Sequence, residues 1–340
     1  MKAYADSLST RPLGLGCASL GNLYRAISDD LARETVEAAW DAGIRYFDTA
    51  PYYGLGLSER RLGDALRGRA RANYRLSTKV GRLLDPDGRP DLPSERHGFH
   101  TSMPFSVRYD YSYDGIMRSH EASLQRLGLA GVDILLVHDI GRTTHGDGHA
   151  AHFRALAESG YRALDELRSA GDVSGIGLGV NEWEVCGEAM AIGQFDYFLL
   201  AGRYTLLEQE PLHGFLDDCA AHGAKIILGG AYNSGILATG TRRSPTPFYN
   251  YEPAPKSIID RVVRIERLAD THGVTLAAAA LQFPLAHPVI DIVIPGLGDP
   301  ARVKQTIALH SERIPAQFWA DMKAEGLIDP QAPVPWAVER

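Results

Sequence analysis

Eight short apolar segments recur along the 340-residue chain, and most of them are followed by the pattern of an amphipathic helix. Short apolar strands that alternate with helices are typical of a parallel sheet buried on both faces. Eight such units favour a closed (β/α)8 TIM barrel over a doubly wound sheet. The expected strands are LGLGC (13–17), IRYFD (44–48), YRLSTK (74–79), VDILLVH (132–138), SGIGLGV (174–180), FDYFLL (195–200), AKIILG (224–229) and DIVIP (291–295).

The length leaves room for long βα loops and a C-terminal extension, because a (β/α)8 barrel takes roughly 250 residues. The aperiodic stretch 82–111 is expected to be such a loop, functional or mobile. Ser28 and Ser58 are placed to begin the helices that follow the first two strands, and a further helix is expected from about 150 to 170. No repeat or linker divides the chain, so we expect one domain over residues 1–340.

Composition excludes several classes of partner. The net charge is −7 with no basic tract, whereas nucleic-acid binding needs clustered positive charge. The N-terminal residues lack the apolar core of a signal peptide, and no apolar run is long enough to span a bilayer. Cys17, Cys186 and Cys219 are far apart, which favours a reducing compartment over a disulfide framework. We expect a cytoplasmic protein that binds a small-molecule substrate, with neither a nucleic-acid nor a membrane partner.

Polar residues close three of the expected strands. Asp48, Lys79 and His138 end the segments IRYFD, YRLSTK and VDILLVH, and Tyr53 follows Asp48 in the turn FDTAPYYGLGLSE. A parallel barrel collects its strand ends and βα loops on one face, where the chemistry of such barrels takes place. These four residues are therefore expected to form one site.

Each of the four residues also has a plainer explanation. Asp48 suits a turn cap, Lys79 a side chain that reaches solvent from a strand end, His138 a buried and satisfied histidine, and Tyr53 loop packing. Their joint placement at strand ends favours the site, because packing alone does not require all four together.

The residue types indicate proton handling at a carbon–oxygen bond. The pKa of tyrosine is near 10, and an ammonium within about 4–6 Å is expected to lower it by roughly 1–3. In this scheme Asp48 pairs with Lys79, Lys79 lowers the pKa of Tyr53, and His138 hydrogen-bonds the reacting oxygen. None of the four supplies a hydride or an activated water, so a redox cofactor is implied.

The segment FDTAPYYGLGLSE, followed in order by STK (77–79) and LLVHD (135–139), resembles the aldo-keto reductase superfamily from about Leu13 to about Leu309. The resemblance implies a (β/α)8 barrel that binds a nicotinamide cofactor across its strand ends. It implies Tyr53 as proton donor or acceptor, Lys79 and Asp48 as the pair that tunes it, and His138 as the residue that orients the substrate.

The resemblance also implies a set of cofactor contacts. Asn181 occupies the position that bonds the nicotinamide carboxamide, AYNSGILATG (231–240) is similar to the segment that cradles the pyrophosphate, and IPGLGDPARVKQT (294–306) to the one that holds the adenosine. The residues assigned to the cofactor are Asn181, Tyr232, Asn233, Ser234, Gly235, Gly296, Arg302 and Thr306.

The chain departs from the family pattern at three positions. Ala201 stands where a glutamine often ends the sixth strand, Gly296 where many NADP-dependent members carry lysine, and Thr306 where they carry asparagine. A 2′-phosphate needs a fork of positive charge, for which Arg302 and Lys304 remain. The reduced set favours NAD, with NADP as the alternative.

Two further segments, AGRYTLLEQ (201–209) and GGAYNSGIL (229–237), resemble the branch that contains D-threo-aldose 1-dehydrogenase (L-fucose dehydrogenase), with pyridoxal 4-dehydrogenase and plant L-galactose dehydrogenases as near relatives. These enzymes oxidise a cyclic hemiacetal to a lactone, which implies Tyr53 as the base. We predict an aldose such as L-fucose as substrate. The alternatives are pyridoxal, a general aldehyde or ketone reductase, and a cofactor-binding auxiliary subunit without turnover.

Loop residues are expected to line the substrate, and the segments 82–111 and 240–255 to close over it. Aromatic faces and forked donors suit a sugar and pyridoxal equally. The residues assigned to the substrate are Tyr52, Trp183, Arg203 and Tyr204, together with the segment FYNYEP at 248–253.

Two other motifs were weighed. The glycine patterns GLGCASLGN (14–22) and GIGLGV (175–180) lack the helix or the turn that a Rossmann site requires. His145, His149 and His152 have spacings that suit zinc on a helix, but the glycines among them favour a solvated loop, so no metal is expected.

Overall fold

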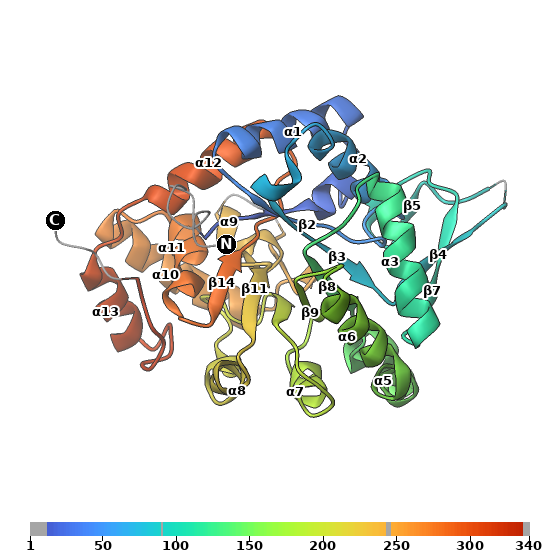
Figure 1. Cartoon of the computed structure of the whole chain (residues 1–340). Helices are drawn as coiled ribbons and strands as arrows, with labels where there is room; N and C mark the ends of the chain where they lie inside the picture. The colour runs from blue at the N-terminus through green and yellow to red at the C-terminus, as the bar shows by residue number, and fades with distance from the viewer. Residues whose placement is uncertain (1–11, 90, 243–245, 336–340) are drawn as a thin grey trace.

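The computed structural model describes residues 12–89, 91–242 and 246–335. Its main sheet has eight parallel strands in the order β1–β2–β3–β8–β9–β10–β11–β14 (Figure 1). All eight expected strands are found, each within a few residues of its predicted position. Their bounds are β1 (Leu15–Gly16), β2 (Tyr46–Asp48), β3 (Arg75–Val80), β8 (Ile134–His138), β9 (Gly175–Val180), β10 (Tyr197–Ala201), β11 (Lys225–Gly229) and β14 (Ile290–Val293).

The first and last strands join to close the barrel. Leu13 pairs in parallel with Val293, and Gly16 pairs with Gly296. The backbone N–H of Gly14 donates to the carbonyl of Val293 over 2.9 Å. A Cβ at Gly14 would lie 2.8 Å from the Ile294 side chain, so this close approach of the two strands requires glycine. The predicted (β/α)8 barrel is confirmed.

Side chains fill the interior of the barrel. A cluster of buried apolar residues occupies it, and burial of each large side chain contributes about 1.5–3 kcal/mol. Near the start of β3, Arg75 donates to the Tyr197 hydroxyl over 2.9 Å and to Asp291 over 3.4 Å. The barrel is therefore a packed core, and a ligand has to bind at the rim. The cluster comprises Tyr46, Ile134, Leu136, Leu199, Ile227, Ile292 and Ile294.

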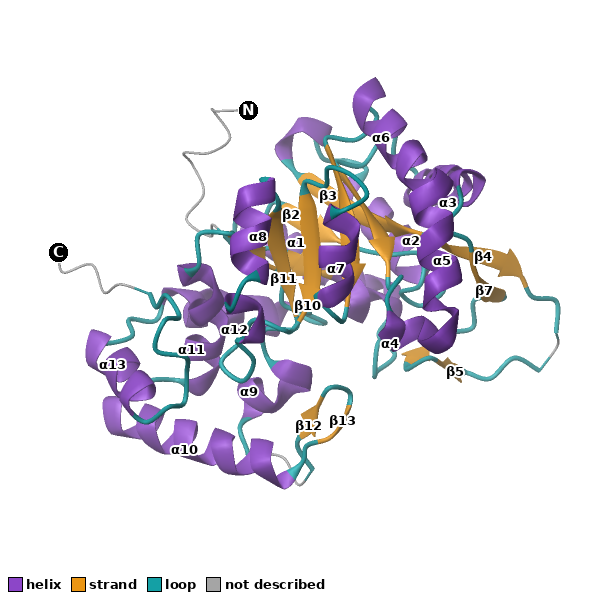
Figure 2. Cartoon of the chain, turned by 90° about the horizontal axis from the view of Figure 1, so that it is seen from below, coloured by secondary structure: helices purple, strands orange, loops and turns teal. Residues whose placement is uncertain are grey.

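Helices cover the outside of the barrel (Figures 1 and 2), and a larger apolar core lies between them and the strands. In chain order they are α1 (Asp29–Asp41), α2 (Leu57–Leu66), α3 (Tyr113–Leu127), α4 (Arg142–His145), α5 (His149–Ala155), α6 (Tyr161–Ala170), α7 (Glu184–Met190), α8 (Phe215–His222), α9 (Ile236–Thr239), α10 (Lys256–His272), α11 (Leu276–Gln282), α12 (Pro300–Ser311) and α13 (Ala316–Ala324).

One of the two predicted serine caps is confirmed. The Ser28 hydroxyl accepts from the backbone N–H of Leu31 over 3.1 Å at the start of α1. Ser58 is not a cap, because α2 begins one residue earlier, at Leu57, with Gly56 as its cap. The buried Ser58 hydroxyl instead donates to the Cys17 carbonyl over 2.7 Å, which ties α2 to the end of β1.

The stretch 82–111 is more ordered than its lack of periodicity indicated. β4 (Arg82–Pro86) pairs antiparallel with β7 (Phe105–Tyr109), and β5 (Glu95–Arg96) pairs with β6 (Phe99–His100). Figure 1 shows this ribbon projecting from the barrel. Most of its residues are at least partly exposed, so no alternation of apolar and polar residues marks the strands.

A second hairpin follows β11 in the chain (Figure 2). It pairs β12 (Phe248–Tyr249) with β13 (Glu252–Pro253), and Tyr251 in its turn is 58% exposed. Within the described ranges, no helix has both the length and the apolar character needed to cross a bilayer.

Candidate active site

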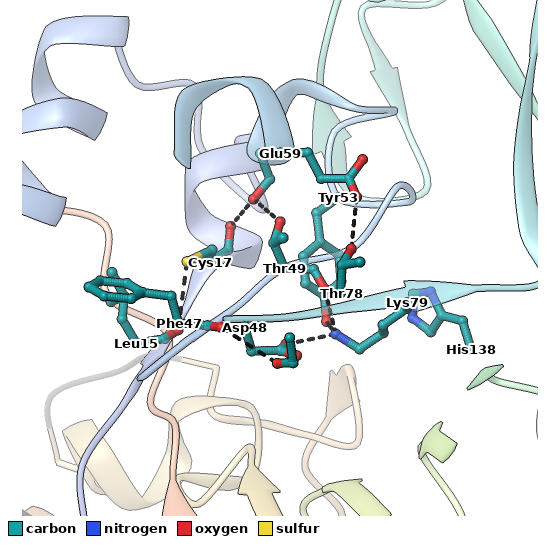
Figure 3. Close-up of polar contacts among 12 residues, drawn as sticks. Leu15, Cys17, Phe47, Asp48, Thr49, Tyr53, Glu59, Thr78, Lys79 and His138 are labelled. Atoms are coloured by element: carbon teal, nitrogen blue, oxygen red, sulfur yellow. Dashed lines mark hydrogen bonds and ion pairs between the residues drawn. The ribbon is translucent and has the colours of Figure 1, made fainter. Parts of the chain in front are cut away.

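The four residues predicted to act together meet at the C-terminal ends of β2, β3 and β8 (Figure 3). The Lys79 Nζ atom lies 2.7 Å from Asp48 Oδ2 and 3.0 Å from the Tyr53 hydroxyl. The His138 ring packs edge-on against the Tyr53 ring, with 5.9 Å between their centres. The barrel thus brings side chains from three strands and one loop into a single cluster.

Buried polar contacts hold the loop that carries Tyr53. Gly54 has φ +65°, and a Cβ there would lie 2.4 Å from the Gly21 carbonyl oxygen, so the loop packs directly on the turn after β1. The fully buried Glu59 accepts from the Thr78 hydroxyl over 2.7 Å and pairs with Arg126 over 2.5 Å. The glycine, serine and glutamate of FDTAPYYGLGLSE therefore fix the position of Tyr53 relative to Lys79.

The Lys79 ammonium is 1% exposed and has all three of its donors satisfied. Besides Asp48 and Tyr53, it donates to the Thr49 carbonyl over 3.0 Å. Asp48 in turn accepts from the Ser77 hydroxyl over 2.7 Å. Burial lowers the pKa of Lys79, but Asp48 and Tyr53 together outweigh burial, and the pKa lies above its ordinary value. The lysine is therefore a fixed positive charge and does not take part in proton exchange near neutral pH.

The expectation that Lys79 lowers the pKa of Tyr53 below its ordinary value is wrong for this structure. Burial raises the pKa of Tyr53 to about 12, and the charge of Lys79 offsets only part of that rise. The Tyr53 ring is enclosed by Phe99 of the β4–β7 ribbon, whose ring centre is 6.1 Å away, and by His138. Because Lys79 donates to the phenol oxygen, the phenol's own proton is free to bond a reacting oxygen.

His138 is held neutral. Burial, together with the positive charges of Arg82 and Lys79, lowers its pKa well below the ordinary value. Among the described residues its buried Nδ1 has no hydrogen-bond partner, and an unsatisfied buried polar atom of this kind destabilises the fold by about 1–3 kcal/mol. A neutral imidazole with unused bonding capacity beside Tyr53 suits the positioning of a substrate oxygen.

Of the residues assigned to the substrate, Tyr52 lies at the site. Its ring packs edge-on against His138, with 5.8 Å between centres, and the Arg82 guanidinium stacks 4.0 Å from its centre. The others lie in different surroundings. Arg203 binds Glu208 over 3.0 Å and Asn250 of the β12–β13 hairpin over 3.1 Å. Trp183 packs against Phe215, with 5.4 Å between ring centres.

The assignment of Tyr204 to the substrate is wrong. Its side chain is 0% exposed and stacks on Phe283, with 5.4 Å between ring centres. The ring also packs against His287, with 5.5 Å between centres. Tyr204 is a core residue, because the backbone after Arg203 turns its side chain inward.

Two of the cofactor segments present polar groups suited to a dinucleotide. Asn233 and Ser234 have φ of +44° and +57°, and Asn233 donates to the buried Glu208 over 2.7 Å. Among the described residues its buried Oδ1 has no partner. A Cβ added at Gly235 would meet nothing within 4 Å, and at Gly296 the nearest atom is 3.6 Å away, so both segments offer open backbone. Tyr232, at the start of the first segment, is half-buried against the core.

The segment after β14 carries two exposed positive charges, Arg302 and Lys304. Arg302 is 67% exposed and lies 3.7 Å from Asp299, which also pairs with Arg25 over 3.7 Å. Lys304 lies in a groove between α1 and α12. Thr306 lies in α12 with its side chain buried, and its assignment as a cofactor contact stays a prediction.

Residues that the sequence reasoning missed surround the predicted ones. Arg82 and Asp139 form a buried ion pair over 2.5 Å, and Asn181 donates to Asp139 over 3.1 Å. Asp139 directly follows His138, and Arg82 lies three positions after Lys79, so proximity in the chain was the available signal. Nothing local in the sequence indicated that Phe99 would cover Tyr53.

The three histidines at 145–152 have protein partners. His145 Nε2 lies 2.9 Å from the Tyr111 hydroxyl, and His149 bonds the Ile140 carbonyl over 3.0 Å and Glu188 over 3.1 Å. His152 stacks on His145, with 4.1 Å between ring centres. In the part of the chain that the structure describes, no group of three or more His, Cys, Asp or Glu side chains is placed to hold a metal ion.

The chain is similar to known proteins over nearly its whole length. The sequence model of the Aldo/keto reductase family matches residues 12–325. The chain is 44% identical to pyridoxal 4-dehydrogenase of Microbacterium luteolum, over 94% of this chain and 95% of that protein. It is 40% identical to D-threo-aldose 1-dehydrogenase of a Pseudomonas species, over 96% and 97% of the two chains.

A solved structure shares the fold. The holo form of an aldo-keto reductase from Bacillus halodurans superposes with a TM-score of 0.70 at 23% sequence identity, covering 96% of this chain and 94% of that one.

Proposed function

Since the chain belongs to the aldo/keto reductase family and is therefore an NAD(P)-dependent oxidoreductase, we propose that it oxidises the C1 hemiacetal hydroxyl of an aldose to a lactone. The observation that carries the proposal is the contact of Lys79 with both Asp48 and Tyr53, beside a neutral His138 whose ring packs against the Tyr53 ring. A phenol bonded by a fixed ammonium, with its ring packed against a neutral imidazole, suits transfer of one proton at an oxygen atom. The 40% identity to D-threo-aldose 1-dehydrogenase supports an aldose as the donor.

In the proposed reaction the C1–H and O–H bonds break and a C=O bond forms. When bound, a nicotinamide cofactor supplies the acceptor for the hydride from C1. Tyr53 takes the hydroxyl proton, and His138 hydrogen-bonds the same oxygen and fixes its distance from Tyr53. Before this transfer Tyr53 passes its own proton to solvent and becomes a phenolate. Lys79 stabilises that phenolate, because its ammonium is already 3.0 Å from the phenol oxygen.

Tyr53 is the proposed base even though its pKa is about 12. A hemiacetal hydroxyl is acidic for an alcohol, so its proton is easier to remove than that of a simple alcohol. Lactone formation also releases no free aldehyde. In the reverse direction the neutral phenol is already in the form that donates a proton to a carbonyl oxygen.

NAD is the proposed cofactor. Asn181, Asn233, Ser234 and Gly235 would hold its nicotinamide and pyrophosphate. At the adenosine end, Asp299 pairs with both Arg25 and Arg302, which reduces the positive charge left for a 2′-phosphate.

Pyridoxal is a second candidate substrate. Pyridoxal 4-dehydrogenase is 44% identical to this chain, and pyridoxal also forms a cyclic hemiacetal. Aromatic rings lie beside the tetrad of Asp48, Tyr53, Lys79 and His138, where the Tyr52 ring packs against Phe99 and His97 with 5.5 Å between centres in each case. Such a surface suits pyridoxal as well as a sugar. The two substrates use the same residues for proton transfer.

One experiment tests the function and separates the candidates. The purified protein is given NAD or NADP together with L-fucose, other aldoses or pyridoxal, and the absorbance of the reduced cofactor is followed. We expect NADH formation with an aldose and recovery of the lactone. Oxidation of pyridoxal far more efficiently than any aldose would overturn the aldose assignment. No turnover with any hemiacetal would overturn the proposed reaction.

A further inference from the structure

A buried ion pair that exchanges no proton in the proposed reaction lies beside His138, with Asp139 Oδ2 3.5 Å from His138 Nε2. Arg82 Nη2 is 2.5 Å from Asp139 Oδ2, and Arg82 is 4% exposed. Asp139 directly follows His138 and has φ +44°, a left-handed conformation that is uncommon outside glycine. Burial raises the pKa of the Asp139 carboxyl, and the Arg82 guanidinium opposes that rise.

Stability alone gives a weak reason for this pair. Buried ion pairs often contribute no more than well-packed apolar side chains would, because both charges lose their hydration. Strained backbone that persists beside a reaction centre is a reason to look for a role there. The contact that Asp139 makes with its second carboxylate oxygen indicates that role.

Asp139 Oδ1 accepts from the side-chain amide of Asn181 over 3.1 Å. An ionised carboxylate has only acceptors, so Asn181 must turn its NH2 group toward Asp139 and its carbonyl oxygen away. On that other side the Tyr251 hydroxyl approaches Asn181 Oδ1 at 3.4 Å. Asn181 Oδ1 is therefore an acceptor on the side of the β12–β13 hairpin, and its present bond is long enough for a ligand N–H to replace it.

We propose that the Arg82–Asp139 pair fixes the hydrogen-bonding direction of Asn181, so that Asn181 Oδ1 accepts an N–H from the carboxamide of a bound nicotinamide. Asp139 is a positioning residue that acts through Asn181, and Arg82 holds the Asp139 carboxylate in place. The inference rests on the proposed function, because it requires a nicotinamide cofactor at this rim.

The test measures binding of two oxidised cofactors by quenching of tryptophan fluorescence. One is NAD, and the other is its 3-acetylpyridine analogue, in which a methyl group replaces the carboxamide NH2 and removes the N–H donors. We expect the unmodified protein to bind NAD more tightly by about fivefold or more, the effect of one hydrogen bond. In Asp139→Asn the Asn181 amide is free to turn over, and the preference should fall to within about twofold.

Two further variants keep the test decisive. Asn181→Ala removes the acceptor and should abolish the preference even if Asp139→Asn fails to fold. Asp196→Asn is the matched control, because Asp196 also pairs with an arginine, Arg168, over 2.8 Å and accepts a backbone N–H. This control should retain the full preference for NAD.

Equal binding of the two cofactors by the unmodified protein would overturn the inference, as would a folded Asn181→Ala or Asp139→Asn that keeps the full preference. These results leave the proposed reaction standing if hemiacetal oxidation is still observed. Failure of the unmodified protein to bind either dinucleotide, with no turnover, would instead refute the proposed function.

Discussion

The two sides of the barrel rim differ in how firmly their polar groups are held. On the side of β2, β3 and β8, Lys79 is buried with every donor satisfied, and its partner Asp48 is bonded in turn by Ser77. On the side of β10 and β11, Tyr251 is 58% exposed and contacts Asn181 at 3.4 Å. The difference indicates that the reacting groups are preorganised before a ligand binds, whereas the ligand-binding side retains contacts that are readily exchanged.

The largest expected effect is a loss of turnover when Tyr53, on the side of β2, β3 and β8, is replaced. Tyr53→Phe removes the proton acceptor and should lower turnover by at least about 10², with cofactor affinity little changed. Turnover is measured by NADH formation and affinity by fluorescence titration. Retention of turnover without the phenol would remove Tyr53 from the mechanism.

The next largest effect is on the preference between NAD and NADP, at the residues expected to hold the adenosine end of the cofactor. Gly296 is exposed, and a side chain there meets Ser19 only at ordinary contact distance, so Gly296→Lys should fold normally. The new ammonium should improve kcat/KM with NADP relative to NAD by about tenfold or more, because one hydrogen bond to a charged group is worth about 1.5–3 kcal/mol. A strong preference for NADP in the unmodified protein would show that Arg302 and Lys304 already suffice.

A smaller effect is expected for Arg203, which connects the loop after β10 to the β12–β13 hairpin. Arg203→Met loses the contacts with Glu208 and Asn250 and should raise the KM of the cofactor by about three- to tenfold. Turnover at saturating cofactor should stay within about threefold, since neither contact reaches the tetrad. A loss of turnover at unchanged KM would instead place Arg203 with the reacting groups.

The smallest effect is expected for Tyr204→Phe, which serves as the matched control for Tyr53→Phe. The Tyr204 hydroxyl is buried, and among the described residues it has no hydrogen-bond partner, so its removal leaves no donor or acceptor unpaired. The KM of the substrate should change by less than about twofold. A clear rise in this KM would restore Tyr204 as a substrate contact.

What the sequence could predict follows the same division. Asp48, Lys79 and His138 end buried strands, and the rule that parallel barrels gather strand ends on one face places them together. Spacing does not decide where a loop side chain points, so Tyr204 was assigned to the substrate although its side chain is fully buried. That residues 1–340 form one domain and that the protein is cytoplasmic stay predictions.

The pKa of Tyr53 shows a second limit of local reasoning. The neighbouring charge of Lys79 was predictable, but Phe99 reaches Tyr53 only because the ribbon after β3 folds back over the site. Burial of Tyr53, to which that segment contributes, decides the sign of the shift. A local motif can therefore give the identity of a reacting group without its protonation equilibrium.

The pH dependence of kcat/KM for hemiacetal oxidation tests the role of Tyr53 most directly. Because a base must be deprotonated and the pKa of Tyr53 is raised to about 12, log kcat/KM should rise with pH through the neutral and alkaline range, without a plateau near pH 7. His138, with its lowered pKa, is already neutral in this range and should add no inflection. A profile that levels off near neutral pH would contradict a buried Tyr53 as the proton acceptor.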